Sequence, residues 1–320
     1  MMLKLDEWLS RVGKADRLAL IAHVSPDGDT VGATLALRLA FLSQGKKVDV
    51  ICDGMAPQSL HFLPGVDAFI LPEQAEGVYD AAIAVDVSDY KLLGKSASVF
   101  DAAAEKLVID HHATNSGYGD WNYIRGNECA CCVLAYEAIV QMGVEITCEI
   151  GTCLMTGMST DTGHFMYPYT TPLAFEIAGK LCAIGVDISY ITRVLYRTVP
   201  MKRMNLTRRA YEKMRFELSD RVGVIALTQK DFEETGAGLD QTVGLVNAAL
   251  EVEGVRMAIL ATERENGVKL SMRAVEPDKV SDIAKVFGGG GHAQAAGCTI
   301  AAPMDEAIAM VLAEMSKKLG

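Results

Sequence analysis

The stretch RLALIAHVSPDGDTVGATLALRLAFLSQG, residues 17–45, decides the fold of the first half of the chain. It opens with a nearly continuous apolar run, residues 17–24, which predicts a buried strand. The polar loop SPDGD follows, and apolar residues then recur at helical spacing up to Gly45, a helix-terminating glycine. A strand, a loop and a helix in this order predict one unit of an α/β fold.

The same alternation continues along the first half of the chain. Further strands are predicted in KKVDVICDG (46–54), YDAAIAVDVSD (79–89) and EKLVIDHH (105–112), with helical patterns between several of them. Strands that alternate with helices indicate a parallel sheet with helices on both faces. The fold class is therefore α/β for an N-terminal domain that we place at residues 1–192.

The second half has a different pattern. Helical periodicity dominates after residue 133, and a basic segment, residues 193–217, is predicted to be a helical linker. Beyond it, strands are predicted in RVGVIALTQ (221–229), VRMAILATERENGVKLSMRAV (255–275) and CTIAA (298–302), with a hairpin turn at Asn266–Gly267. Residues 218–320 are therefore expected to form a smaller mixed-sheet α+β domain.

Composition limits the kinds of function. The 320 residues carry a net charge of −11, and no basic stripe of the kind that binds long nucleic acid is visible. No apolar run is long enough to cross a bilayer, and the N-terminus does not resemble a secretory signal. The eight cysteines include the cluster CACC (129–132), but no second pair gives zinc-site spacing, so these cysteines are expected to be small buried residues at a helix start. We expect a soluble cytoplasmic protein without a membrane partner.

Polar side chains gather where the predicted strands end. They are His23, Asp27 and Asp29 after the first strand, Asp86 near the end of the third, and Asp110, His111 and His112 after the fourth. Ligands of open parallel sheets bind at this edge. Any one aspartate could instead be a turn or cap residue, and Asp29 could cap a helix that starts at Thr30. Together with Asp161, the imidazoles and carboxylates suit manganese, magnesium or iron, and two divalent ions would cancel the charge of four aspartates.

Five ordered segments resemble a known family. HVSPDGDTVGA (23–33), AVDVSD (84–89), VIDHHATN (108–115) and STDTGHF (159–165) resemble the four motifs of the DHH phosphoesterases. FGGGGHAQAAGC (287–298), with KLSMRA (269–274) before it, resembles the glycine-rich signature of the C-terminal domain associated with that family. Within the family, the sequence most resembles the branch of the nano-RNases and pAp phosphatases.

The resemblance implies two metal ions and the residues that hold them. Manganese is expected first, with magnesium, iron or cobalt as alternatives. One ion would be held by His23, Asp27 and Asp86, and the other by Asp29, Asp86, His111 and Asp161, so that Asp86 bridges. The expected catalytic residues are His112, facing away from His111 and acting on the scissile phosphate or the leaving oxygen, and Asp110, supporting the ligand His111 or its loop.

The resemblance also assigns substrate contacts to the second domain. Backbone N–H groups of a glycine run can approach an anion, and side-chain donors lie nearby in sequence, so the expected contacts are Arg273, Gly288, Gly289, Gly290, Gly291 and His292. His164 is a further candidate substrate contact. The chain departs from the branch at ECACC (128–132) and at Ala274, and neither departure is expected to touch a metal ligand.

The implied activity is hydrolysis of very short oligonucleotides to mononucleotides and of pAp to AMP. The alternative is a stand-alone phosphodiesterase of cyclic di-AMP or pApA, which shares the motifs. An inorganic pyrophosphatase would not need the glycine-rich module, and a catalytically dead nucleotide-binding regulator would lose ligands that are all present here. The expected partners are short oligonucleotides and small nucleotides, and the sequence leaves open whether the chain forms a homodimer.

Overall fold

The computed structural model describes residues 1–319. Their contacts divide into two compact units, one from Met1 to Thr198 and the other from Val199 on. The boundary between the two units falls inside the basic segment 193–217. Helix α8 (Met201–Glu212), which fills much of that segment, buries Leu206 and Ala210 in a core of the second unit. The limits of the domains and of a linker stay predictions.

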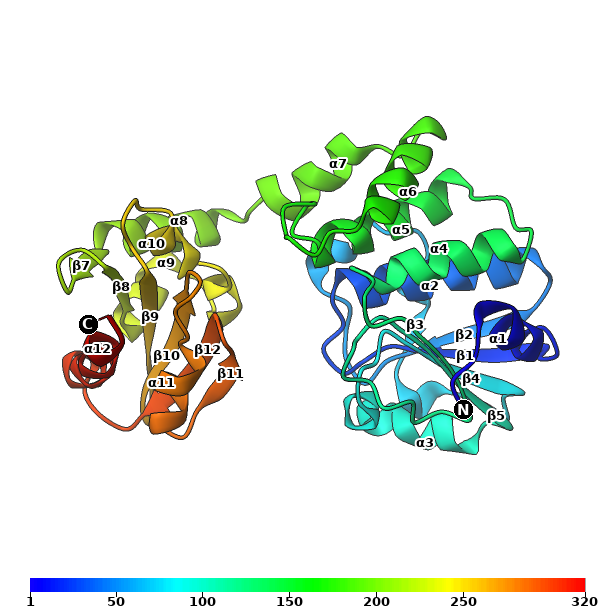
Figure 1. Ribbon diagram of the computed structural model, residues 1–320, viewed down its shortest axis with the longest axis horizontal. Coiled ribbons are helices and arrows are strands. Elements are labelled where there is room, and N and C mark those ends of the chain that lie inside the picture. Colours follow the sequence, from blue (N-terminus) through cyan, green and yellow to red (C-terminus); the bar gives the residue numbers. More distant parts are fainter. Residues whose placement is uncertain (320) are drawn as a thin grey trace. The chain divides into compact units, whose positions relative to one another are not determined.

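The first unit is built on a parallel sheet, shown in Figure 1, that has six strands among the described residues. The strands are β1 (Arg17–Ile21), β2 (Lys47–Ile51), β3 (Phe69–Ile70), β4 (Ala81–Val85), β5 (Glu105–Asp110) and β6 (Trp121–Ile124). Their spatial order is β3-β2-β1-β4-β5-β6, so β1 pairs with β2 on one side and with β4 on the other. Sequence patterns missed β3, which has two residues, and β6, which is short and contains the buried polar Asn122.

Helices cover both faces of this sheet, as the sequence predicted. The helices of the first unit are α1 (Leu5–Val12), α2 (Gly28–Ser43), α3 (Ala97–Ala102), α4 (Cys131–Gln141), α5 (Cys148–Asp161), α6 (Pro172–Ala183) and α7 (Ile188–Thr192), of which α6 and α7 pack against α5. Leu18 and Leu20 of β1 belong to the core formed with α2, α4 and α5, whereas Ala19 and Ile21 belong to the core that includes Phe100 of α3. Figure 1 shows α2 and α4 on one face of the sheet and α3 on the other. Burial on both faces explains why residues 18–21 of β1 and all of β4 are apolar.

The second unit contains a mixed sheet with strand order β11-β12-β10-β9-β8-β7. Its strands are β7 (Arg215–Glu217), β8 (Val222–Leu227), β9 (Met257–Arg264), β10 (Gly267–Ala274), β11 (Gly290–His292) and β12 (Ala295–Ile300). Its helices are α8, α9 (Gln229–Thr235), α10 (Asn247–Leu250), α11 (Ser281–Val286) and α12 (Met304–Leu319). The β8–β9 pair is parallel and the other pairs are antiparallel, so the mixed α+β class is confirmed.

The hairpin between β9 and β10 differs from its prediction by one residue. Arg264 pairs with Gly267, so Glu265 and Asn266 form the turn and Gly267 begins β10. Gly267 has a φ of 130°, and a Cβ there would lie 2.3 Å from the carbonyl oxygen of Ile300. The glycine is therefore required by the close approach of the neighbouring strand rather than by the turn.

Two further properties are the lengths of the helices and the state of the cysteines. None of the helices that the structure describes is both long and apolar enough to span a membrane. All eight cysteines are free thiols, and those of the CACC cluster are buried, with Cys131 and Cys132 in the first turn of α4.

Candidate functional site

The predicted polar residues of the first unit gather at one edge of its sheet. β1 and β4 are neighbours in space but not in sequence, so the carboxyl ends of these strands form a topological switch point, where ligands of such sheets bind. A cavity of about 270 Å³ opens there, lined by His23, Val24, Ser25, Asp27, Asp86, Ser88, Leu92, His112 and Asp161.

One group of possible metal ligands consists of His23, Asp27 and Asp86, which offer atoms within 4.8 Å of one another. Asp27 is also the N-cap of α2. Its Oδ1 accepts hydrogen bonds from the backbone N–H groups of Asp29 (3.0 Å) and Thr30 (3.1 Å). The predicted alternative, a cap at Asp29, is therefore wrong, because α2 begins at Gly28 and Asp29 lies in its first turn.

A second group consists of Asp29, His111 and Asp161, again within 4.8 Å of one another. His111 Nδ1 lies 3.1 Å from the carbonyl oxygen of Glu128, which can only accept, so Nδ1 carries the proton. Its Nε2 then holds a lone pair, and this buried atom has no hydrogen-bond partner among the described residues. It lies 3.2 Å from Asp161 Oδ2 and 3.4 Å from Asp86 Oδ1. This is the tautomer of a histidine that binds a metal through Nε2.

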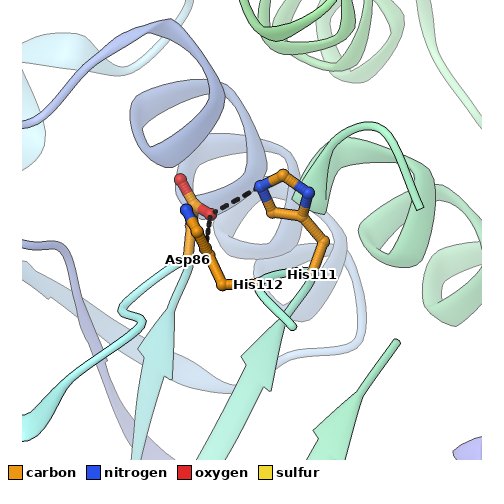
Figure 2. Close-up of side chains that lie close together, drawn as sticks. All are labelled: Asp86, His111 and His112. Carbon is orange, nitrogen blue, oxygen red and sulfur yellow. Dashed lines mark ion pairs between the residues drawn. The ribbon is translucent and has the colours of Figure 1, made fainter. Parts of the chain in front are cut away.

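Asp86 lies between the two groups. Figure 2 shows the rings of His111 and His112 beside its carboxylate. Its Oδ2 accepts a hydrogen bond from Thr30 Oγ1 at 2.7 Å, whereas its buried Oδ1 has no such partner among the described residues. The backbone of Asp86 is left-handed, with a φ of 60°, an arrangement that is uncommon outside glycine and tends to occur at functional sites.

Asp29 is held by the ECACC segment (128–132), which was expected to touch no metal ligand. Its Oδ2 and Oδ1 accept hydrogen bonds from the backbone N–H groups of Cys131 (2.5 Å) and Cys132 (2.9 Å), at the N-terminus of α4. The expectation that ECACC touches no proposed metal ligand is therefore wrong. A backbone N–H group can donate a hydrogen bond whatever the side chain of its residue. The residue types in this segment therefore gave no sign of the contact.

The electrostatics of the cluster favour a bound cation. Burial is the largest cause that raises the pKa of Asp29 and, still more, that of Asp86, whose neighbours Asp29 and Asp27 add to the effect. Burial followed by the charges of Asp29 and Asp27 raises the pKa of Asp161 to about 9. Carboxylates that repel one another in a dry site are stabilised by divalent ions. Together with the unpartnered Asp86 Oδ1 and His111 Nε2, they form a donor set that fits such ions.

Asp110 and His112 form a pair that the sequence did not predict. Asp110 Oδ1 accepts from His112 Nδ1 and from the backbone N–H of His111, both at 2.8 Å, and its Oδ2 accepts from Asn115 Nδ2. Asp110 therefore orients the ring of His112, whereas the ring of His111 is oriented by the Glu128 carbonyl group. The hydrogen bond to Asp110 is the largest cause that raises the pKa of His112.

The two histidines do not face away from each other, which corrects the prediction. Their ring centroids are 4.4 Å apart, and His112 Nδ1 lies 3.6 Å from Asp86 Oδ1. The alternation of side chains applies within a strand, and β5 ends at Asp110. Sequence reasoning also missed Thr30 and Asn115, although both lie inside the quoted motifs, because their roles depend on contacts made across the fold.

His164 is engaged within the protein. Its Nδ1 lies 3.0 Å from Ser159 Oγ and its Nε2 lies 3.4 Å from Thr192 Oγ1, while its ring is 5.2 Å from that of Tyr196. The predicted substrate contact at His164 receives no support from this geometry. The residue instead connects the turn after Asp161 to the helical segment that ends the first unit.

The predicted substrate residues of the second unit line a cavity of about 670 Å³. Its lining includes Arg273, His292 and Gly288 to Gly290, together with Lys269, Ser271 and Phe287, which were not predicted. Gly291 does not line it. A Cβ at Gly291 would lie 2.4 Å from the carbonyl oxygen of Ala295, so this glycine allows β11 to pack against β12.

Comparison with known proteins identifies the class. The sequence model described as the DHH family, N-terminal domain, matches residues 17–158, and that of the DHHA1 domain matches residues 221–319. The chain belongs to the DHH family, as its motifs predicted. Asp161 lies just beyond the first matched range, so its assignment depends on the fourth motif and on its position beside His111.

Within this family, the chain is similar to proteins named bifunctional oligoribonuclease and PAP phosphatase NrnA. The Thermus thermophilus protein is 31% identical over 94% of this chain and 89% of its own length, and the Bacillus subtilis protein is 23% identical over 92% of each. The crystal structure of an exopolyphosphatase-related protein from Bacteroides fragilis superposes with a TM-score of 0.89 at 27% identity, covering 98% of this chain and 95% of that one.

Proposed function

We propose that this protein is a metal-dependent phosphodiesterase and phosphatase that hydrolyses very short oligonucleotides to mononucleotides and pAp to AMP. The observation that carries the proposal is the buried, unpartnered Asp86 Oδ1, with His111 on one side and the His112–Asp110 pair on the other. The names of the relatives from T. thermophilus and B. subtilis support the same activity and favour it over a phosphodiesterase of cyclic di-AMP.

Two divalent ions would be held by the residues that the motifs indicate. His23, Asp27 and Asp86 would hold one, and Asp29, Asp86, His111 and Asp161 the other. Such ions, when bound, neutralise the carboxylates, polarise the phosphate ester and lower the pKa of water. Manganese is our first choice because the donors are carboxylates and imidazoles without thiolate.

His112 and Asp110 would act on the leaving group. Asp110 accepts a hydrogen bond from the Nδ1–H group of His112 and favours the doubly protonated ring, which leaves the proton on Nε2 available for the departing oxygen. In the second unit, Arg273, His292 and the backbone of Gly288 to Gly290 would bind a phosphate group of the substrate. Free cysteines are compatible with a cytoplasmic location.

A substrate panel tests the proposal. With manganese added, two- to five-nucleotide RNAs and pAp should be hydrolysed, and removal of metal by a chelator should abolish turnover. Catalytic efficiency should fall steeply between about five and about ten nucleotides, because each phosphate of a long strand needs a cationic contact and this acidic chain has few. Preference for cyclic di-AMP, or a flat or rising length series, would contradict the proposal.

A further inference from the structure

One face of the second unit's sheet is only half covered. Val268, Leu270 and Met272 of β10 point into the core formed with α11 and α12. On the opposite face, Ala258 and Leu260 of β9 are packed in a core that includes α8 and α10. The same face continues onto β10 and β12, where Lys269 and Thr299 are exposed and the cavity of about 670 Å³ lies.

A row of polar side chains occupies this uncovered half. Arg273, Ser271 and Lys269 pair across the ladder with Ala258, Leu260 and Thr262, so they share the face that the helices cover farther along. Their partners on β12 are Ala295, Gly297 and Thr299, two of which are too small to fill the space above the sheet. The result is a groove over β10 and β12 that carries the cations Lys269 and Arg273.

The cations of this groove lack acidic partners. Lys269, Arg273 and His292 line the cavity, and no aspartate or glutamate does. Lys269 and Arg273 take part in no ion pair among the described residues. In a chain with a net charge of −11, two cations without counter-charges in one groove indicate an anionic ligand.

The spacing of the row exceeds what one phosphate group needs. Alternate residues of an antiparallel strand are about 6.8 Å apart, so Lys269 lies about 13–14 Å along β10 from Arg273. A phosphate held by Arg273, His292 and the glycine backbone therefore leaves Lys269 and Ser271 free for the next phosphate of the same strand.

The row of polar side chains ends beside a second cavity, which is acidic. Thr299, opposite Lys269, is shared with a second cavity of about 600 Å³, whose charged lining consists of Glu233, Glu263, Glu265 and Arg264. Three carboxylates against one guanidinium repel a further phosphate.

We propose that Arg273 and Lys269 form a track for two successive phosphate groups of a short oligonucleotide, and that the track stops at Thr299. The inference rests on the proposed function and adds to it a physical reason for short substrates. A 5′-phosphorylated dinucleotide, with one phosphate besides the scissile one, uses Arg273 alone. A 5′-phosphorylated trinucleotide uses both residues, and a longer strand gains nothing more.

Binding to the full chain in the presence of a chelator tests the track apart from catalysis. Without metal, the carboxylates of the first unit repel phosphate, so both phosphate groups of pAp are free to occupy the track. Lys269→Gln should therefore weaken binding of pAp about tenfold, the loss given by one charged hydrogen bond, and leave AMP, which has one phosphate, unchanged. The slope of log affinity against log salt concentration should fall by about 0.7 for pAp alone. Lys279→Gln, at an exposed lysine that lines neither cavity, is the matched control and should change neither ligand.

Turnover with manganese tests the length limit. Lys269→Gln should lower kcat/KM about tenfold for the trinucleotide but not for the dinucleotide, and Glu265→Lys should raise kcat/KM for ten nucleotides relative to three. Equal weakening of AMP and pAp by Lys269→Gln, or an unchanged length series in Glu265→Lys, would overturn the track. If the chain hydrolyses no oligonucleotide, the proposed function fails, whereas the pAp and AMP measurements still decide the track.

Discussion

The two units carry candidate sites of opposite charge and opposite construction. In the first unit, carboxylates from the loops after β1 and β4, from α2 and from α5 converge, and Asp29 and Asp86 are almost entirely buried. In the second unit, Lys269, Ser271 and Arg273 stand on one strand over an open face. A substitution in a site assembled from many buried elements is expected to abolish its activity. A substitution in a row on one strand should instead weaken binding by one contact at a time.

The largest effect is expected at Asp86. Asp86→Ala removes a carboxylate that belongs to one candidate ligand group and lies beside His111 of the other, so both ions should be lost. Turnover should fall by far more than the 10–100-fold typical of changes around a metal ligand. Elemental analysis of the purified variant measures the metal. The control variant, Asp67→Ala at an exposed aspartate of the same unit, should keep both ions. If Asp86→Ala also keeps both ions, Asp86 does not bridge them.

The next effect separates the two adjacent histidines. His111→Ala deletes the Nε2 that lies beside Asp86 and Asp161, so metal content should drop. His112→Ala should retain the metal and lose about 10²–10⁴-fold in kcat, the contribution of a general acid. Metal content and kcat measured on both variants decide the assignment, and equal metal loss in the two would refute it.

Local sequence patterns predicted most of the fold and the set of side chains that gather at the site. Strand–loop–helix patterns predicted β1, β2, β4, β5 and the mixed second domain, because apolar runs and turn residues carry that information locally. Polar residues at strand ends predicted which side chains gather, because the carboxyl ends of parallel strands meet at one edge.

What the sequence could not give depends on contacts made after folding. His111 and His112 lie beyond the end of β5, so alternation did not apply to them. The support of Asp29 comes from backbone N–H groups of Cys131 and Cys132, which every residue except proline possesses. Lys269 was overlooked although alternation along a strand places it on the face of Arg273, because only the structure shows that this part of the face is open.

A third test asks whether the buried site depends on close packing. A Cβ at Gly157 of α5 would lie 2.2 Å from Cys132 Sγ and 2.8 Å from Asp29 Oδ1. Gly157→Ala should therefore lower the free energy of unfolding by about 3 kcal/mol and reduce metal content by displacing Asp29. The matched variant, Gly179→Ala in α6, has no atom within 4 Å of the new Cβ and should be stabilised by up to about 1 kcal/mol. Denaturant titration of both measures the difference, and a well-tolerated Gly157→Ala would contradict it.

The smallest effect concerns a buried acid in the second unit that contrasts with those in the first. Asp231 Oδ1 accepts from Arg209 at 2.9 Å, and its Oδ2 accepts from Lys213 at 2.5 Å and from the backbone of Thr228 at 2.7 Å. Burial alone would raise the pKa of Asp231, but Lys213 and Thr228 outweigh it and lower the pKa to about 2. Asp161, half-buried among other carboxylates, has its pKa raised instead, so the partners of each carboxylate decide the direction of its pKa shift.

A pKa that is lower in the folded than in the unfolded chain means that the ionised carboxylate of Asp231 stabilises the fold. This contribution is complete above the unfolded pKa of about 4 and is lost as the pH falls through about 2. Asp231→Asn should therefore lower the free energy of unfolding by about 2 kcal/mol at pH 7. The gap between variant and parent should narrow below about pH 4, whereas Asp240→Asn, at an exposed position of the same unit, should match the parent throughout. Denaturant titrations at pH 7, 4 and 3 measure this, and a gap that widens with acid would show that Asp231 resembles the acids of the first unit after all.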